Sequence, residues 1–439
     1  MNKTIEGKLN RELGIWDVIT NVLSISIGSG IFLLPALVYV ILGHASILSY
    51  VFCGLIFLFL GLCFGELSSR VSDTGGLYVY IERAFGPMAG FIANVLYWFG
   101  IGVLACGALM NALADIAGTY FPIFQETWAR IAFFAAITSL SCFLNIKGIR
   151  DSMVLIKVLT WTKVISLMAL VGVGLTHVEL ANISWEGFPE FNKVGEASIL
   201  LIFAFLGGEL SLSVGGEMKN PTRTGPIGFI VGIVLVIFGF VTIHLAVQGV
   251  LGDSLLINQD APLAELAKAL FGEIGFFLVL VLSFIAVWST LSSIFTLLPR
   301  ILFAGAQDGL MPKILAKIHP SYSTPYAAIL FLGVLEFAFA ASGSFRYLLV
   351  LVTGASLILY FGAVLAFFKL RIIDRRSGGE VFKVKGGYLI GAITLVALGW
   401  VFFQLQSTEI QGISLFLGIL VIIYYILNYF KIRKKKENF

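Results

Sequence analysis

Residues Ser26–Phe32 read SIGSGIF and lie inside an apolar run, from about residue 15 to residue 42, that is long enough to cross a bilayer. Glycine carries a large backbone entropy cost in a helix, and serine competes for backbone hydrogen bonds, so this stretch is a poor helix former. The sequence therefore predicts a membrane helix that unwinds at Ile27–Gly30. In hydrocarbon, an unwound backbone is tolerated only where it is buried in protein or lines a wet cavity.

A break at mid-membrane has a chemical consequence. It exposes free N–H groups on one half-helix and free C=O groups on the other, which suit a carboxylate and an ammonium respectively. The alternative for this stretch alone is a notch of small residues where two helices pack closely.

The composition indicates an integral membrane protein. Of the 439 residues, 59% are hydrophobic and only 12% are charged, against about 25% charged in a soluble domain. The first apolar run is too long for a signal-peptide core and lacks a cleavage site, so we expect it to stay in the mature protein. The four cysteines lie within apolar runs and lack metal-ligand spacing, which favours buried reduced thiols. We expect no metal and no cofactor.

The chain divides into polar tails and twelve apolar segments. Residues 1–13 and 431–439 are the tails, and an amphipathic helix on the membrane face is predicted between Asp73 and Gly86. Lysine and arginine gather in alternate loops, which places both termini in the cytoplasm of a multi-pass cell-membrane protein. The basic C-terminal tail is then an anchor to anionic lipid rather than a nucleic-acid site. The segments run over about 14–42, 46–69, 87–119, 128–145, 152–178, 196–218, 226–251, 274–304, 325–341, 346–370, 386–404 and 411–430.

A second interruption lies in the sixth segment, where Gly207 and Gly208 break an apolar helix and Glu209 follows at membrane depth. Interruptions in the first and sixth of ten segments are typical of a five-plus-five inverted repeat, whose axis places both breaks at the midplane. We therefore predict a transport core over 14–370, made of repeats 14–178 and 196–370, with two further helices over 386–430.

At this point the chain resembles a known family, the amino acid permeases of the amino acid–polyamine–organocation superfamily. The resemblance covers about residues 10–370 and rests on the order and spacing of short motifs. Among subfamilies, Gly28–Ala36 and Asn94–Trp98 look most similar to the bacterial arginine–agmatine antiporters. The motifs are Gly28–Phe32 with Pro35, Gly65–Ser68, Gly75–Tyr80, Ala84–Pro87, Phe203–Glu209, Gly216–Arg223, Arg300 and Gln307–Pro312.

The resemblance implies an all-α, LeuT-like fold with twelve transmembrane helices and broken helices 1 and 6. It also implies a substrate with an α-amino group and usually a carboxylate. Ser29 and Gly30 would offer N–H groups to the carboxylate, and Phe205 would be an aromatic gate. The carbonyls of Ser26, Phe203 and Leu206 would accept from the ammonium. The predicted substrate-binding set is Ser26, Ile27, Gly28, Ser29, Gly30, Phe203, Phe205, Leu206, Gly207 and Gly208.

Ionisable side chains inside the membrane are costly and are functional candidates by default. Glu209 would bind a substrate cation or carry a proton, or else stabilise the loosened backbone of the first helix. Lys163 lies about three turns into the fifth segment. In permeases of this family that run on protons, a lysine here replaces a sodium ion, and we expect it to meet carbonyls near Ile25 and Ser292 or Ser293. Its alternative is to reach the membrane interface.

Two other residues within the membrane segments have more than one interpretation. Tyr97 on the third segment is a candidate for lining the path, although membrane aromatic residues are more often packing residues. Glu336 in the ninth segment has no obvious partner, so a subunit contact or a position at headgroup level would explain it.

These observations predict a secondary amino acid transporter that works by alternating access, driven by protons or by exchange. An arginine/agmatine-type or other amino acid or polyamine antiporter is the alternative, and a homodimer is left open. A channel or a membrane enzyme is a remote alternative, because the sequence lacks a filter loop, a Walker motif and a Ser/His/Asp signature.

Overall fold

The computed structural model describes residues 13–28, 30–147, 149–257, 261–343, 345–373, 381–405 and 407–437. Within these ranges the chain is helical apart from its connecting loops and one isolated bridge between Leu13 and Met218. Within the described residues, eight helical stretches are long and apolar enough to cross a membrane, and three shorter apolar helices accompany them. The prediction of an all-α, multi-pass membrane protein is confirmed, and the number of twelve spans stays a prediction.

The first half of the chain folds into helices that follow the predicted segments 1–5. The first segment is divided into two helices, and a π-helix interrupts the third. The elements are α1 (Ile15–Ser26), α2 (Gly30–Leu42), η1 (Gly43–Ser46), α3 (Ile47–Arg70), α4 (Leu77–Phe85), α5 (Pro87–Val95), the π-helix η2 (Leu96–Val103), α6 (Leu104–Tyr120), η3 (Pro122–Gln125), α7 (Thr127–Lys147), α8 (Ile149–Leu175) and α9 (Leu180–Ile183).

The second half repeats the pattern of a divided helix followed by long ones. The sixth predicted segment becomes α10 and a 3₁₀ helix, η4. The elements are α10 (Phe191–Phe205), η4 (Gly208–Glu217), α11 (Pro221–Leu251), η5 (Gly252–Leu256), α12 (Pro262–Gln307), η6 (Lys313–Ala316), α13 (Tyr326–Ser342), α14 (Phe345–Ile373), α15 (Gly387–Phe402) and α16 (Ser407–Glu437).

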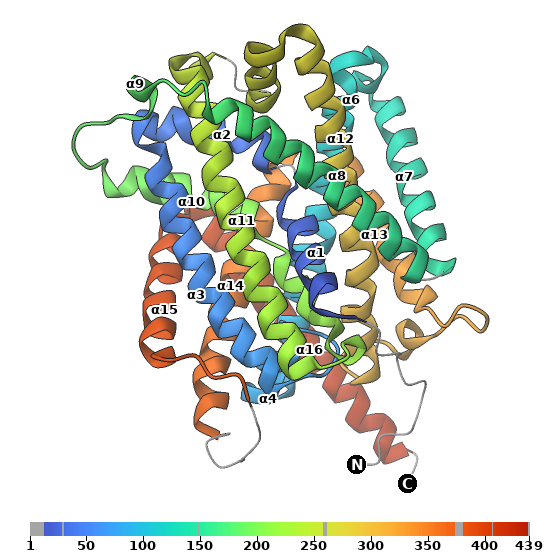
Figure 1. Ribbon diagram of the computed structural model, residues 1–439. Helices are drawn as coiled ribbons and strands as arrows, with labels where there is room; N and C mark the ends of the chain where they lie inside the picture. The colour runs from blue at the N-terminus through green and yellow to red at the C-terminus, as the bar shows by residue number, and fades with distance from the viewer. Residues whose placement is uncertain are drawn as a thin grey trace.

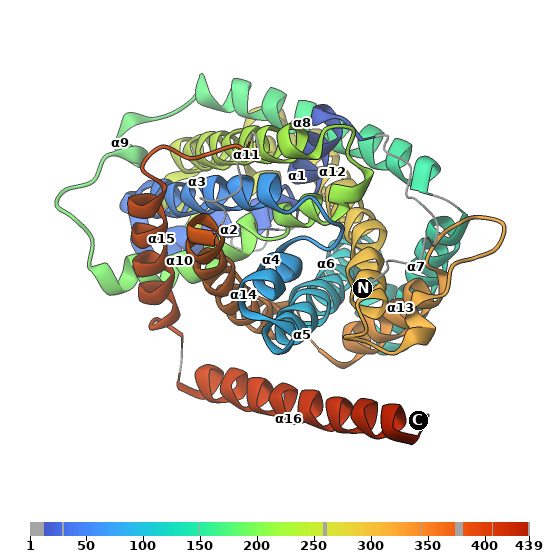
Figure 2. The same cartoon turned by 90° about the horizontal axis from the view of Figure 1, so that it is seen from below.

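The divided helices lie in the interior of the bundle (Figure 1). Helix α1 packs against α8, α11, α12 and η4, and α2 packs against α10, α11 and α12. Every residue of α1 from Val18 to Ser26 is buried. The end of the chain lies at the periphery: seen from below, α16 runs along one edge of the molecule (Figure 2), where it contacts α14 and α5. The short first half-helix is therefore placed by its neighbours, since a helix of this length is marginal alone.

Helix α4 confirms the helix predicted between Asp73 and Gly86, but its apolar face does not lie on lipid. Leu77, Tyr78, Tyr80 and Ile81 are buried, and α4 packs against α5, α14 and η4. The backbone N–H of Gly75 donates to the carbonyl of Ser213 at 2.8 Å, which ties the loop before α4 to η4. The amphipathic pattern thus predicts the helix correctly. Its apolar face is covered by other helices of the bundle instead of by lipid.

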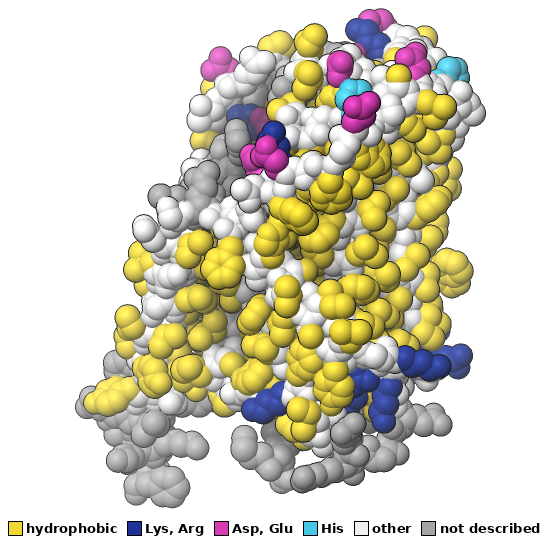
Figure 3. All heavy atoms as spheres, turned by 90° about the vertical axis from the view of Figure 1, so that its left-hand side faces the viewer, with side chains coloured by type: hydrophobic (Ala, Val, Ile, Leu, Met, Phe, Trp, Pro, Cys, Tyr) yellow, Lys and Arg dark blue, Asp and Glu magenta, His cyan; other side chains and the backbone are white. Residues whose placement is uncertain are grey.

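The outer wall is apolar between charged ends. On the left-hand side of the molecule, hydrophobic side chains cover the middle, lysine and arginine lie at both ends, and aspartate and glutamate gather toward the upper end (Figure 3). A wall of this kind is what a hydrocarbon environment requires.

Candidate substrate site

Two helix interruptions define the centre of the molecule. Helix α1 ends at Ser26, Ile27 leaves the helical region with φ −84° and ψ 70°, and α2 begins at Gly30. Helix α10 ends at Phe205, and Gly207 adopts φ +90°, a left-handed conformation that glycine adopts without a steric penalty. Ser29 lies outside the described residues. Both interruptions expected from the glycine patterns are therefore present.

The two interruptions lie side by side. A Cβ placed on Gly208 would lie 3.1 Å from Oγ of Ser26, and one placed on Gly30 would lie 3.0 Å from Cβ of Ala204. A Cβ on Gly207 would collide with Ile25. The glycines thus allow the backbones of α1, α2 and the α10–η4 junction to approach closely, which is the arrangement that the inverted-repeat argument requires.

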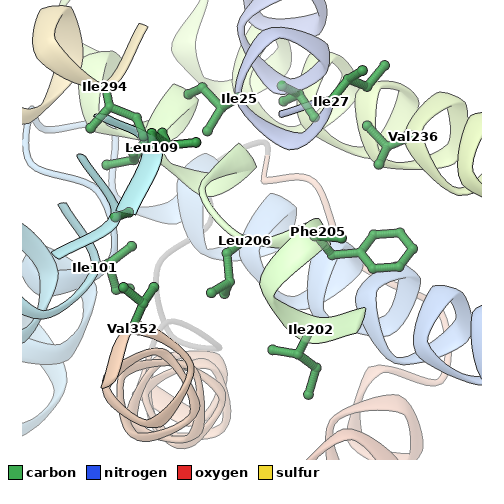
Figure 4. Close-up of a cluster of buried hydrophobic side chains, with 14 of the residues drawn as sticks. Ile25, Ile27, Ile101, Leu109, Ile202, Phe205, Leu206, Val236, Ile294 and Val352 are labelled. Atoms are coloured by element: carbon green, nitrogen blue, oxygen red, sulfur yellow. The ribbon is translucent and has the colours of Figure 1, made fainter. Parts of the chain in front are cut away.

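A small cavity of about 40 Å³ opens at this meeting point. It is too small for an amino acid and holds at most a few water molecules, so substrate binding must move the lining elements apart. Figure 4 shows the aliphatic side chains of this region converging from several helices. The cavity is lined by Ile25, Ser26, Gly28, Gly30, Ile101, Ala105, Leu109, Ala204, Leu206, Gly207, Leu210, Thr290, Ile294 and Val352.

The cavity lining is apolar except for backbone groups and two hydroxyls. Ser26 and Thr290 supply the hydroxyls, and Oγ of Ser26 has no hydrogen-bond partner among the described residues. Among the residues that the structure describes, no charged side chain lines the cavity. The first turn of α2, which begins at Gly30, has N–H groups with no intrahelical partner, and these are suited to an anion.

Lys163 of α8 is fully buried against the broken end of α1. Its Nζ donates to the carbonyl oxygens of Ser24 and Ile27, both at 2.7 Å, and lies 3.4 Å from Oγ1 of Thr290. The lysine therefore donates hydrogen bonds to carbonyls that the interruption leaves without a helical partner. It does not reach the membrane interface, so the alternative reading of Lys163 is wrong.

The expected partners on α12 were wrong in detail. Among the described residues, Thr290 contacts Lys163, and neither Ser292 nor Ser293 does. Ser293 instead pairs with Oγ of Ser24 at 2.7 Å, and its own hydroxyl donates to the carbonyl of Ser289. The hydroxyl of Thr290 donates to the carbonyl of Ser24 at 2.8 Å. The reason is helical phase: position 290 faces α1 and α8 together, whereas position 292 is turned away.

Glu209 is the first acid after the second interruption, and it is 2% exposed. Its carboxylate lies against the backbone at Gly207 and Glu209, and its neighbours are the hydroxyls of Tyr97 and Tyr360. Oε1 of Glu209 and both hydroxyls lack a hydrogen bond of good geometry among the described residues. Three elements, η2, η4 and α14, thus bring an acid and two tyrosines together one layer behind the cavity. Tyr360 was not foreseen, because one tyrosine in an aromatic-rich span carries no signal.

Phe205 does not cover the cavity. Its fully buried ring stacks on Phe57 of α3 at 4.9 Å and meets the edge of Phe240 of α11 at 4.8 Å. In Figure 4 it points away from the side chains of Ile101, Leu109 and Val352. The expected aromatic gate at Phe205 is therefore not seen in this conformation. Phe203 lies in the last turns of α10, and only its backbone belongs to the described part.

Ion pairs hold the end of the bundle where α1 begins. Nε of Arg300 lies 2.9 Å from Oε1 of Glu217, and the backbone of Glu217 accepts from the N–H of Leu13 at 3.0 Å. Asp17 of α1 pairs with Lys157 of α8 at 2.5 Å. These contacts join the start of α1, the end of η4, α8 and α12 at this end of the bundle.

Glu336 lies in neither of the places that were expected. It is fully buried between α6, α7 and α13, beside the thiols of Cys106 and Cys142, and is thus neither a subunit contact nor a headgroup-level residue. Neither carboxyl oxygen has a hydrogen-bond partner of good geometry in the described part of the chain.

Comparisons with known proteins agree with this geometry. The chain is 27% identical over 433 residues to the serine/threonine exchanger SteT of Bacillus subtilis, which covers 95% of this chain and 96% of that protein. It is 25% identical to the branched-chain amino acid permease BcaP of the same organism, over 75% of this chain and 74% of that protein. It is 26% identical to the chloroplastic cationic amino acid transporter 9 of Arabidopsis thaliana, over 73% and 59%.

A family model described as amino acid permease matches residues 13–434, nearly the whole chain. This match includes both helix interruptions, the buried lysine and the acid beside the cavity. The chain belongs to the amino acid permease family, and it is a transporter rather than an enzyme.

Proposed function

We propose that this protein carries neutral amino acids with small or medium-sized side chains across the cell membrane, without sodium. The observation that carries the proposal is the lining of the cavity, in which the side chains that face the substrate are aliphatic or hydroxylic. A guanidinium or a second ammonium would lie there without a carboxylate, and burying an unpaired charge is costly.

The zwitterionic part of the substrate would bind to backbone groups. Its carboxylate would accept from N–H groups at the start of α2, with Ser29 and Gly30 as the predicted donors. Its ammonium would donate to carbonyls at the ends of α1 and α10, including those of Ser26, Phe203 and Leu206. Ile27, Gly28, Gly207 and Gly208 would shape this backbone site. Neutral dipoles of this kind hold a zwitterion without a permanently buried charge.

Lys163 supports independence from sodium. Its ammonium already occupies the space between two α1 carbonyls and Thr290, where an inorganic cation would need oxygen ligands. A site that carries its own cation has no need of a sodium ion, so protons or exchange remain as the driving process. Lys163 would release and regain a proton as α1 moves during the cycle.

The Glu209 group supports coupling rather than recognition of a cationic substrate. The carboxyl faces Tyr97 and Tyr360 rather than the cavity. An acid and two hydroxyls that lie together where η4, η2 and α14 meet would respond to movement of the second broken helix. We therefore propose a gating and coupling role for Glu209 and Tyr97, with Ser293 supporting α1 through Ser24 and Ser292 contributing no contact to the site.

An arginine/agmatine-type antiporter is the second candidate. The observation that favours it is Glu209 next to the broken helix, since a modest rearrangement would aim the carboxylate into an enlarged cavity. One relative is named for cationic amino acids and another for serine and threonine, so the relatives leave this choice open.

The test is uptake into proteoliposomes that contain the purified protein. Labelled serine, alanine, leucine and arginine would be supplied separately, with and without internal unlabelled substrate, and with sodium or potassium outside. We expect uptake of the neutral amino acids, acceleration by internal substrate, and no effect of sodium. Uptake restricted to arginine or polyamines would favour the second candidate, and stimulation by sodium would contradict the role given to Lys163.

A further inference from the structure

An apolar groove of about 640 Å³ lies on the outer wall between α3, α10 and α15, away from the substrate site. All of its lining side chains are aliphatic or aromatic. Val51 of α3 and Val396 of α15 lie on its rims and are 45% and 74% exposed, whereas Val194 of α10 forms its floor and is 5% exposed. The ring of Phe52 meets the edge of Trp400 at 5.4 Å and closes one part of the wall.

The size and surroundings of the groove fit a slender hydrocarbon. A cavity of about 150 Å³ takes a benzene-sized molecule, so the groove has room for an extended chain. A transmembrane helix is about 10 Å across with its side chains, which makes it a much bulkier occupant than an extended acyl chain. Helices α3, α10 and α15 lie on the left-hand side of Figure 1, and the face seen from that side is apolar between its ends (Figure 3).

A cation stands beside the groove at one end. Lys193 lies in the first turn of α10, next to Val194, and its side chain is exposed. Among the described residues its ammonium has no ion pair, although Glu190 and Glu196 lie three residues away on either side. The neighbouring aromatic residues Trp185 and Phe188 are 41% and 68% exposed, which is typical of the level of lipid headgroups.

We propose that the groove binds one acyl chain of a phospholipid, whose phosphate is held by Lys193. The chain lies in the leaflet that surrounds the N-terminal end of α3. Because the groove is lined by α3 and α10, a bound acyl chain would affect the position of the second broken helix and therefore transport. Phe57 of α3 stacks on Phe205 at the end of α10, so a chain wedged between α3, α10 and α15 braces the second broken helix from outside.

The experiment uses the full-length protein in vesicles of phosphatidylethanolamine and phosphatidylglycerol. A trace of phosphatidylethanolamine that carries a diazirine on one acyl chain is added, and after irradiation the adducts are mapped by mass spectrometry. We expect adducts to concentrate in peptides that contain residues 48–55 and 392–400. An even spread of adducts over α7, α11, α13 and α16 would mean ordinary surrounding lipid only, and would overturn the proposal.

Two matched variants test whether the acyl chain lies in the groove itself. Val51→Trp fills the groove, whereas Val234→Trp adds the same side chain at a position on α11 of nearly equal exposure, 46%. We expect V51W to reduce the adduct yield in these peptides by about tenfold, and V234W to leave it unchanged. Equal yields in the two variants would contradict a chain seated in the groove.

The headgroup is tested separately. Lys193→Gln should lower the number of phospholipids that survive detergent washing, counted by native mass spectrometry, while leaving the fold intact by circular dichroism. Retention equal to the parent protein would remove Lys193 from the proposal. Recovery of a dimer that loses its contact in V51W would instead assign the groove to a second copy of this chain.

Discussion

At the scale of single residues, we expect Lys163 to matter most for transport. It satisfies two carbonyls that the broken α1 leaves open, and a neutral amide of similar length cannot supply the same charge. We expect Lys163→Gln to reduce uptake by at least about tenfold, since hydrogen bonds to a buried charged group contribute about 1.5–3 kcal/mol each. The measurement is initial uptake of labelled serine or alanine in proteoliposomes.

Lys157 provides the matched control on the same helix. It is 47% exposed and pairs with Asp17 near the end of the bundle, and exposed pairs contribute about 0–1 kcal/mol. Lys157→Gln should therefore change uptake by less than about threefold. Similar losses in both variants would mean that any lysine on α8 serves, and that the buried position has no special role.

We predict that the side chain of Val352 limits the size of the substrate side chain. It lies beside Ile101, on the opposite side of the cavity from Ile25 of α1 (Figure 4). Removing methyl groups there makes room for a larger substrate side chain. Each methylene that fits an apolar pocket changes the discrimination between substrates by about 1–3 kcal/mol. We expect Val352→Ala to shift the ratio of leucine to alanine uptake toward leucine by about tenfold. Val364→Ala on the same helix is also fully buried but does not line the cavity, and it should leave the ratio unchanged.

At the scale of elements, we predict that the contact between η4 and α12 controls access to the substrate site. Glu217 and Arg300 are 9% and 13% exposed and form a 2.9 Å pair that holds the broken helix closed at this end. Arg300→Glu places two acids together, and a shift of about 1.4 kcal/mol between open and closed states changes their populations tenfold. We expect uptake to fall by about this factor in R300E and to recover at least in part in the double variant E217R/R300E. Equal loss in the single and double variants would show that the pair does not act as a closure.

The helix interruptions were predictable from sequence, and the packing around them was not. Paired glycines are poor helix formers wherever they stand, so Gly28, Gly30, Gly207 and Gly208 carried their own signal. The contacts of Thr290, the stacking of Phe205 and the approach of Tyr360 depend on helical phase and on partners far away in the chain. Glu336 shows the same limit, because only the assembled bundle reveals that α6 and α7 cover it.

At the scale of the whole molecule, the direction of insertion follows from charge. Helix α1 begins and α16 ends toward the same end of the bundle (Figure 1), and in Figure 3 the coloured charges at the lower end are lysine and arginine, whereas the upper end shows both signs. Basic residues are retained on the cytoplasmic side. If this end is cytoplasmic, we predict that the Glu217–Arg300 pair closes the site toward the cytoplasm.

This orientation can be read directly with single cysteines. The four native cysteines are buried and give little background with a membrane-impermeant maleimide. Trp185 lies in the loop before α10 and Lys313 in η6, at opposite ends of the bundle by the charge argument, and both are accessible. In right-side-out vesicles we expect Trp185→Cys to be labelled at once and Lys313→Cys only after permeabilisation. The reverse pattern would invert the molecule, and the Glu217–Arg300 pair would then be predicted to close the site toward the outside.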